Sequence, residues 1–186
     1  MTRRSRRAGL AAVGLAASVV VPVADAAAAG TPLPIPNPLT GNWTAPPGSY
    51  TMPATVVVDR AVTVDLSAAT VTGSDGYLFT LRNGGRLTVV GGTLRGTVLG
   101  LVHDTVTAGG SGSVTITNTS LTDVRCIVCA DGAGGPIDAR LSGVRATGLG
   151  DGVRAVTNAL DVHDSVLTGG GAPPLGSPAG LHSLDD

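Results

Sequence analysis

The chain contains an internal repeat, and this feature limits what it can fold into more than any other. Apolar anchors mark five successive units, and they are 23, 27, 25 and 21 residues apart: Leu66, Val89, Ile116, Leu141 and Val162. Further apolar residues stand two positions before and five positions after each anchor, and Thr-Gly or a similar pair follows the later one. A repeat of this length predicts a stack of supersecondary units, none of which is stable alone.

Each unit has the pattern of three short strands joined by turns. An apolar-x-apolar pair such as Leu87 and Val89 places both side chains on one face of a strand. Turn-prone residues follow this pair: Gly91 and Gly92, Asn118, Gly143 and Asp164. A third apolar stretch occupies residues 77–81, 98–102, 126–130, 153–156 and 181–184.

Three strands in one unit predict one coil of a parallel β-helix, because stacked coils bury a common core that a single coil cannot. We therefore expect an all-β solenoid of about five coils. An antiparallel β-sandwich is the alternative, although its turns recur about every 8–12 residues. The chain has no Lys, Glu or Gln, which argues against helical bundles and doubly wound sheets and confines any acid–base mechanism to Asp, Arg and His.

Residues 1–26 have the pattern of an export signal. A basic head with four Arg precedes an apolar run at 8–23, and small residues at Ala24 and Ala26 fit a signal-peptidase site. The run is shorter than the ~20 residues of a membrane span, so we expect a secreted or extracytoplasmic protein without a stable membrane anchor. A Sec signal fits this segment, and the twin-arginine route is the alternative. After cleavage the net charge is −4, which argues against nucleic-acid binding.

Residues 27–48 are rich in proline and are predicted to be a linker or an N-terminal cap, because alternating prolines hold the backbone extended and remove hydrogen-bond donors. The β-helix domain then spans residues 49–186. Trp43 and Tyr50 lie in or beside the proline-rich segment. They are candidates for a sugar-stacking platform or for a cover over the open end of the core.

The last predicted coil leaves three alternatives open, because the terminal coil of a repeat fold exposes backbone groups and apolar side chains. In the first alternative, the loop at 169–180 folds over the last coil. In the second, the last coil docks end to end on another subunit. In the third, the domain is a shortened relative of a longer β-helix.

Asn or Asp residues end the third strands and form a second column: Asn83, Asp104, Asp131, Asn158 and Asp185. Both residue types tolerate left-handed backbone angles and hydrogen-bond their own turn. The column is therefore predicted to be a turn ladder at one corner of the coils.

Three segments carry a resemblance to a known family: GSYTMPATVVVDRAVTVDLSAATVTG at 48–73, SVTITNTSLTDV at 113–124 and LGDGVRAVTN at 149–158. They resemble the right-handed parallel β-helix proteins of the pectate lyase-like superfamily, over about residues 48–186. The resemblance implies a right-handed β-helix. It does not select an activity, because the superfamily includes lyases, glycoside hydrolases, esterases, phage spikes and adhesins.

Asp104, Asp131 and Arg154 are the catalytic candidates that this resemblance implies. Polygalacturonase-like members use clustered aspartates, and Asp104 and Asp131 are expected about 5 Å apart in neighbouring coils. Pectate lyase-like members combine calcium-binding acids with a basic residue. The Gly-His-Gly and Arg-x-Lys motifs of these enzymes are missing, so the turn ladder is the favoured role of the two Asp. No cofactor or metal site is otherwise assigned, and calcium belongs only to the enzyme alternative.

Cys126 and Cys129 also leave two alternatives open. A Cys-x-x-Cys pair in an exported chain suggests a disulfide. However, residues three apart in a regular strand are about 10 Å apart and lie on opposite faces, too far for a bond. Either a tight loop closes the bridge and the strand starts after Cys126, or the two cysteines are unpaired apolar residues of the core.

The sequence therefore predicts a secreted, non-catalytic β-helix domain with a structural or polysaccharide-binding role at or outside the cell envelope. The alternative function is a carbohydrate-active enzyme, a uronan lyase or glycoside hydrolase, that uses Asp and Arg residues on one face of the helix.

Overall fold

The structure is a computed structural model that describes residues 30–73, 78–97, 102–104, 112–124, 126–130, 137–150, 152–156, 159–169 and 182–184. The predicted export signal at 1–26 lies outside these residues, as do Asp131, Asn158 and Asp185 of the predicted turn ladder.

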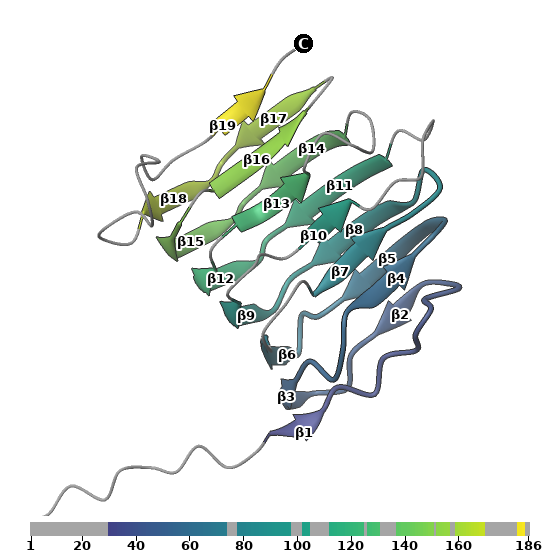
Figure 1. Ribbon diagram of the computed structural model, residues 1–186. Coiled ribbons are helices and arrows are strands. Elements are labelled where there is room, and N and C mark those ends of the chain that lie inside the picture. The colour runs from purple at the N-terminus through teal and green to yellow at the C-terminus, as the bar shows by residue number, and fades with distance from the viewer. Residues whose placement is uncertain are drawn as a thin grey trace, which may run out of the picture.

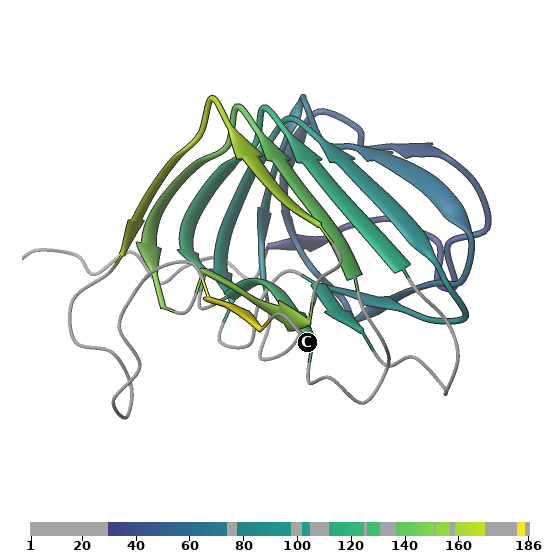
Figure 2. The same ribbon diagram turned by 90° about the horizontal axis from the view of Figure 1, so that it is seen from above.

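The described part of the chain is an all-β parallel solenoid, as the repeat predicts. Its strands stack into three parallel sheets, which enclose a common interior (Figures 1 and 2). Sheet A has seven strands: β1 (Thr31–Pro32), β3 (Gly48–Thr51), β6 (Ala69–Thr72), β9 (Thr93–Thr97), β12 (Ser120–Val124), β15 (Arg145–Leu149) and β18 (Val166–Gly169). Sheet B has six: β4 (Val56–Val58), β7 (Phe79–Leu81), β10 (Val102–Asp104), β13 (Cys126–Ala130), β16 (Gly152–Val156) and β19 (His182–Leu184). Sheet C also has six: β2 (Trp43–Thr44), β5 (Ala61–Asp65), β8 (Arg86–Val90), β11 (Gly112–Thr117), β14 (Ile137–Ser142) and β17 (Leu160–His163).

The predicted apolar columns form the core. Val89 lies opposite Ile116, and Ile116 lies opposite Leu141 in the next coil. All three are buried, whereas the residues between the apolar positions of these strands are exposed or half-buried. Alternation with period two therefore sends one row of side chains inward and the next outward in every coil, and burial of the inward rows stabilises the stack.

The first predicted unit is wrong in register by two residues. Val64, rather than Leu66, lies opposite Val89. The turn after β5 is longer than the equivalent turns, and Leu66 is buried at its start. Asp65 holds this turn, because its carboxylate accepts a hydrogen bond of 2.9 Å from the backbone N–H of Ser67. Hydrogen bonds from the hydroxyl and the N–H of Ser67 lower the pKa of Asp65 below its usual value of 3.8.

The predicted third strand at 98–102 is also shifted. Strand β10 begins at Val102 and ends at Asp104, so only Val102 belongs to both the predicted and the observed strand. Residues 98–101 lie outside the described part of the chain.

The corner between sheets C and A contains a ladder of left-handed residues, as the turn-prone positions predict. Gly91, Asn118, Gly143 and Asp164 have φ angles of 66°, 51°, 63° and 52°. A Cβ atom at Gly143 would clash with the side chain of Asn118 in the preceding coil, so this position also needs glycine for space. Backbone hydrogen bonds continue through the corner, from Gly91 N–H to the carbonyl of Thr117 and from Asn118 N–H to that of Ser142.

The predicted turn ladder at the ends of the third strands is not one column. Asp104 lies opposite Leu81 and Ala130, so Asn83 follows the position equivalent to Asp104 by two residues. Asn83 does have a left-handed φ of 53°, as predicted for a turn residue. Strands β7 and β10 end at the same register position, but Asp104 is the last residue of its strand, whereas Asn83 lies two residues beyond the end of its own.

The proline-rich segment forms the first coil of the solenoid rather than a linker. Strands β1, β2 and β3 pair with the three-sheet stack, and Leu39 bridges to Val58 of β4. Leu33, Ile35 and Leu39 are buried, whereas the prolines between them are exposed. Leu33 and Leu39 donate their N–H groups to the carbonyls of Thr51 in β3 and Val57 in β4. Alternate residues of a parallel ladder point to opposite neighbours, so the prolines occupy positions without a neighbouring strand.

Trp43 and Tyr50 occupy inward positions of this first coil. Trp43 lies opposite Val64, and Tyr50 lies opposite Val71; both partners are buried. The two aromatic side chains are half-buried and pack against the core. Their position is that of a cover over the N-terminal end of the core, and neither lies on an outward row of a sheet.

The last described coil covers its apolar residues less completely. Leu160, Val162 and Leu167 pack against the core but are only partly buried, and Val166 is 56% exposed. The described residues therefore bury the N-terminal end of the core more thoroughly than the C-terminal end.

Candidate ligand-binding groove

The outward face of sheet C carries polar side chains in regular rows. Thr63, Thr88, Thr115, Arg140 and Asp161 occupy one row, each opposite the next in the neighbouring coil. Ala61, Arg86, Ser113 and Asp138 form the row beside it. Neighbouring strands are about 4.8 Å apart and second neighbours along one strand about 7 Å apart, so these rows form a regular lattice that is polar except at Ala61.

A groove crosses this face from β8 over β11 to β14. It has a volume of about 250 Å³ and is lined by Arg86, Gly112, Ser113, Thr115, Asp138 and Arg140. The cause of the hollow is local: the short Ser113 lies between the longer Arg86 and Asp138, whose Cα atoms are about 10 Å apart across two strand spacings. The groove is thus a property of side-chain lengths on an otherwise flat sheet.

The charges in the groove are not paired with one another. Arg86, Asp138 and Arg140 are exposed, and none of them forms an ion pair with another residue in the described part of the chain. Asp161 lies opposite Arg140 in the next strand, so the positive and negative groups alternate across the coils. The guanidinium groups can donate hydrogen bonds, the carboxylates can accept them, and the hydroxyls of Ser113 and Thr115 can do both. This set of groups suits a ligand with many hydroxyls.

Asp104 and Arg154, two of the three catalytic candidates, lie in sheet B rather than at this groove. The residue opposite Asp104 is Ala130, and Asp131 follows it outside the described residues. Arg154 lies opposite Cys129, which in turn lies opposite His103. The register therefore places Arg154 two strands from Asp104 along the sheet.

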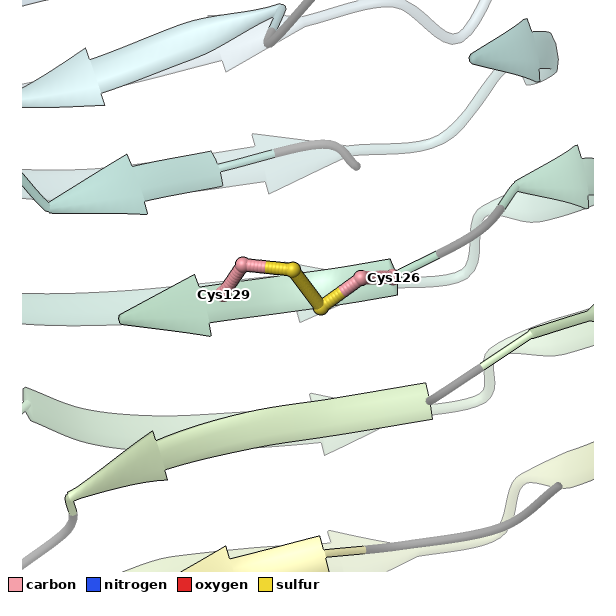
Figure 3. Close-up of a disulfide and its surroundings, with 2 residues drawn as sticks. All are labelled: Cys126 and Cys129. Atoms are coloured by element: carbon pink, nitrogen blue, oxygen red, sulfur yellow. A yellow bond between two sulfur atoms is a disulfide. The ribbon is translucent and has the colours of Figure 1, made fainter. Parts of the chain in front are cut away.

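Cys126 and Cys129 form a disulfide within β13 (Figure 3). Their Cα atoms are 6.0 Å apart, instead of the ~10 Å expected for a regular strand. The register with β16 explains the shorter distance, since Cys126 lies opposite Gly152 and Val128 already lies opposite Val153. One extra residue, Ile127, therefore bulges in β13 and brings the two cysteines together. The predicted disulfide is therefore present, and the alternative of unpaired cysteines is wrong. The bridge closes through a bulge within the strand rather than through a loop before it.

Ser142, His163 and Asp164 form a second polar cluster on the solenoid, at the corner after β17. The Nδ1 atom of His163 lies 3.1 Å from Oδ2 of Asp164 and 3.4 Å from Oγ of Ser142. A catalytic Ser-His-Asp set needs the serine and the carboxylate on different ring nitrogens, because the base receives a proton on one and is oriented through the other. Both contacts here are made by the same nitrogen, so this cluster is not such a set.

Two other features are absent from the described residues. These residues hold no group of three or more His, Cys, Asp or Glu side chains that could ligate a metal ion. They also form no helix that is long and apolar enough to cross a bilayer.

The sequence motifs did not identify the groove, although a signal for it exists. Arg86, Ser113 and Asp138 are 27 and 25 residues apart in the chain and meet only because the coils stack. Aligning the repeat units by their inward residues and then reading the outward positions across the coils would have placed all three side by side.

No known protein family matches the chain, and neither the curated proteins nor the solved structures include a match to it.

Proposed function

We propose that this chain is a secreted or extracytoplasmic, non-catalytic β-solenoid that binds polysaccharide on the outward face of sheet C. One observation carries the proposal: the groove between β8 and β14 presents unpaired donors and acceptors on a regular polar face. A right-handed, pectate lyase-like β-helix is the finer fold that fits the repeat and the parallel sheets, and it is part of the same proposal.

A solenoid supports such a role because its sheets hold side chains on a fixed lattice. The buried inward rows and the ladder of backbone hydrogen bonds fix the strands of sheet C. Outward side chains on these strands therefore start from ordered backbone positions, and less conformational entropy is lost when a ligand binds.

The proposed compartment has two supports. Residues 1–26 have the composition of an export signal. The disulfide between Cys126 and Cys129 fits an oxidising environment outside the cytosol.

The enzyme alternative rests on Asp104, Asp131 and Arg154 and would use calcium as its cofactor. The register places Asp104 and Arg154 two strands apart in sheet B, away from the groove on sheet C. We therefore retain the binding role as the proposal.

A polysaccharide panel tests the binding proposal. The mature chain is run by affinity electrophoresis through gels that contain neutral or acidic polysaccharides, and its absorbance is followed on polygalacturonate with calcium. We expect retardation in at least one gel and no unsaturated product. Retardation in none of the gels would refute the binding role, and product formation would refute the non-catalytic one.

A further inference from the structure

The groove has a direction, because it runs across the strands and along the axis of the solenoid. Arg86 lies on β8, Ser113 and Thr115 on β11, and Asp138 and Arg140 on β14, so each coil contributes one step of the lining. The step is the spacing of neighbouring strands, about 4.8 Å. One sugar unit of an extended glycan has a similar length, so a chain along the groove can meet each coil with one sugar.

The groove has little net charge with which to select a charged ligand. Arg140 has Asp138 two residues before it on the same face of β14 and Asp161 opposite it on β17. An acidic polymer on this face would gain attraction from Arg86 and Arg140 and repulsion from Asp138 and Asp161, so the four charges sum to zero. Vicinal hydroxyls, in contrast, can donate to Asp138 and accept from Arg140 at the same time.

The floor of the groove is also polar. Ser113 and Thr115 are half-buried and present hydroxyls, and the outward rows of β8, β11 and β14 contain no aromatic residue. Recognition in the groove must therefore come from hydrogen bonds to hydroxyls rather than from ring stacking.

We infer that the groove on sheet C binds a neutral, linear polysaccharide, which lies across β8, β11 and β14 with about one sugar per coil. This inference rests on the proposed polysaccharide-binding function and adds the ligand class, the residues and the direction of the chain.

Calorimetric titration of the full chain with its disulfide intact tests the inference. The probes are soluble neutral β-1,4-glucan and β-1,4-xylan oligomers of increasing length, with oligogalacturonates of equal length as the acidic comparison. We expect the affinity for a neutral oligomer to rise up to about three or four sugars and then to level off, because three strands line the groove.

Two pairs of variants locate the site. Ser113→Tyr fills the groove floor, and Ser120→Tyr is its matched control, since Ser120 is an equally half-buried outward serine on sheet A in the same coil. Asp138→Ala removes an acceptor from the groove, and Asp123→Asn removes an exposed carboxylate from sheet A. Asparagine is used at position 123 because it tolerates the left-handed φ of 55° there. We expect Ser113→Tyr to weaken binding at least about tenfold and Asp138→Ala about fivefold, with both controls within about twofold of the parent.

The outcomes separate the inference from the function on which it rests. If a glycan binds but Ser113→Tyr and Asp138→Ala behave like their controls, the groove is refuted and the binding function stands. Preference for oligogalacturonate by tenfold or more would refute the neutral ligand. Absence of binding to every oligomer and to the polysaccharide panel would refute both. Thermal unfolding of each variant, expected to match the parent, excludes misfolding as the cause of a loss.

Discussion

The first and last described coils have the same strand order, yet they close the core differently. In the first coil, Leu33, Ile35 and Leu39 are buried and two aromatic residues pack over the inward positions. In the last coil, Leu160, Val162 and Leu167 remain half-buried. An interior coil is covered from both sides by its neighbours, whereas a terminal coil depends on its own residues for cover. Two coils with the same strand order can therefore cover the core to different degrees.

Prolines in the first coil help to protect the N-terminal edge of the stack. A terminal coil has N–H groups that face no neighbouring strand, and an open strand edge of this kind can pair with another chain. Pro32 and Pro34 are exposed and remove two of these donors, while Leu33 between them still donates to Thr51. The prolines that led to the prediction of a linker are therefore compatible with a strand at the edge of the stack.

The largest predicted effect is a difference in the loss of unfolding free energy when a leucine is truncated in the first or in the last described coil. Leu39 is 1% exposed, whereas Leu167 is only partly buried. We expect Leu39→Ala to lower the free energy of unfolding by about 3 kcal/mol and Leu167→Ala by about 1 kcal/mol. Urea unfolding of both variants measures this difference. Equal losses would mean that the two ends are equally well packed, and the comparison would fail.

Hydrogen exchange sharpens the same comparison without a mutation. The N–H of Leu39 donates to Val57 at 2.9 Å, and the N–H of Val166 donates to Val144 at 2.8 Å, so bond length does not distinguish them. The burial of the two side chains does distinguish them, because Leu39 is buried and Val166 is exposed. Local opening of the backbone is easier where few apolar contacts hold a strand. We expect the amide of Val166 to exchange on the order of tenfold faster than that of Leu39. Slower exchange at Val166 would contradict the difference.

A smaller effect concerns the turn that joins β5 to β6. Asp65 has a pKa lowered by hydrogen bonds from Ser67, and its backbone carbonyl accepts a bond from Ala45 of the first coil. A group whose pKa is lowered on folding contributes stability above its unfolded value of 3.8, and this contribution is lost as the pH falls through the folded pKa.

Asp65→Asn should therefore reduce the loss of Tm that the parent shows below about pH 4. Asp161→Asn in the last coil is the matched control, because no described donor contacts its carboxylate. Melting curves at neutral pH and below pH 4 measure the change. Identical acid profiles for the parent and Asp65→Asn would show that this turn contributes nothing to acid stability.

The smallest effect is expected at the exposed Val166. This residue continues an outward row of sheet A that contains Ser120 and Arg145, so it lies outside the core. Val166→Thr should change the free energy of unfolding by less than about 0.5 kcal/mol. A loss well above this value, measured by the same urea titration, would show that Val166 is covered in solution.

The repeat predicted much of this fold because it records burial directly. Leu87, Val114 and Ala139 are inward residues in neighbouring coils, and their spacing in the sequence gave the correct register of sheet C. The prediction failed where a turn or a strand contains more residues than its neighbours in the stack. The longer turn at Leu66 shifted the first unit, and the bulge at Ile127 made the disulfide geometrically accessible. Neither change leaves a periodic signal.

The groove could not be predicted in the same way. Arg86, Asp138 and Arg140 carry no motif, and the hollow exists because Ser113 is shorter than its neighbours in two other coils. That relation depends on the exact register between strands. Local patterns reveal which residues face inward, whereas the shape of an outward face requires knowing which residues stack.

The most direct test of the account maps a bound glycan onto the solenoid by NMR. The ¹⁵N-labelled chain is titrated with a neutral β-1,4-glucan oligomer, and the amide shifts of β8, β11 and β14 on sheet C are compared with those of β9, β12 and β15 on sheet A. We expect shifts that saturate on sheet C, centred on Ser113, and none that saturate on sheet A. Saturating shifts confined to sheet A or sheet B, or no shifts with any glycan, would contradict this expectation.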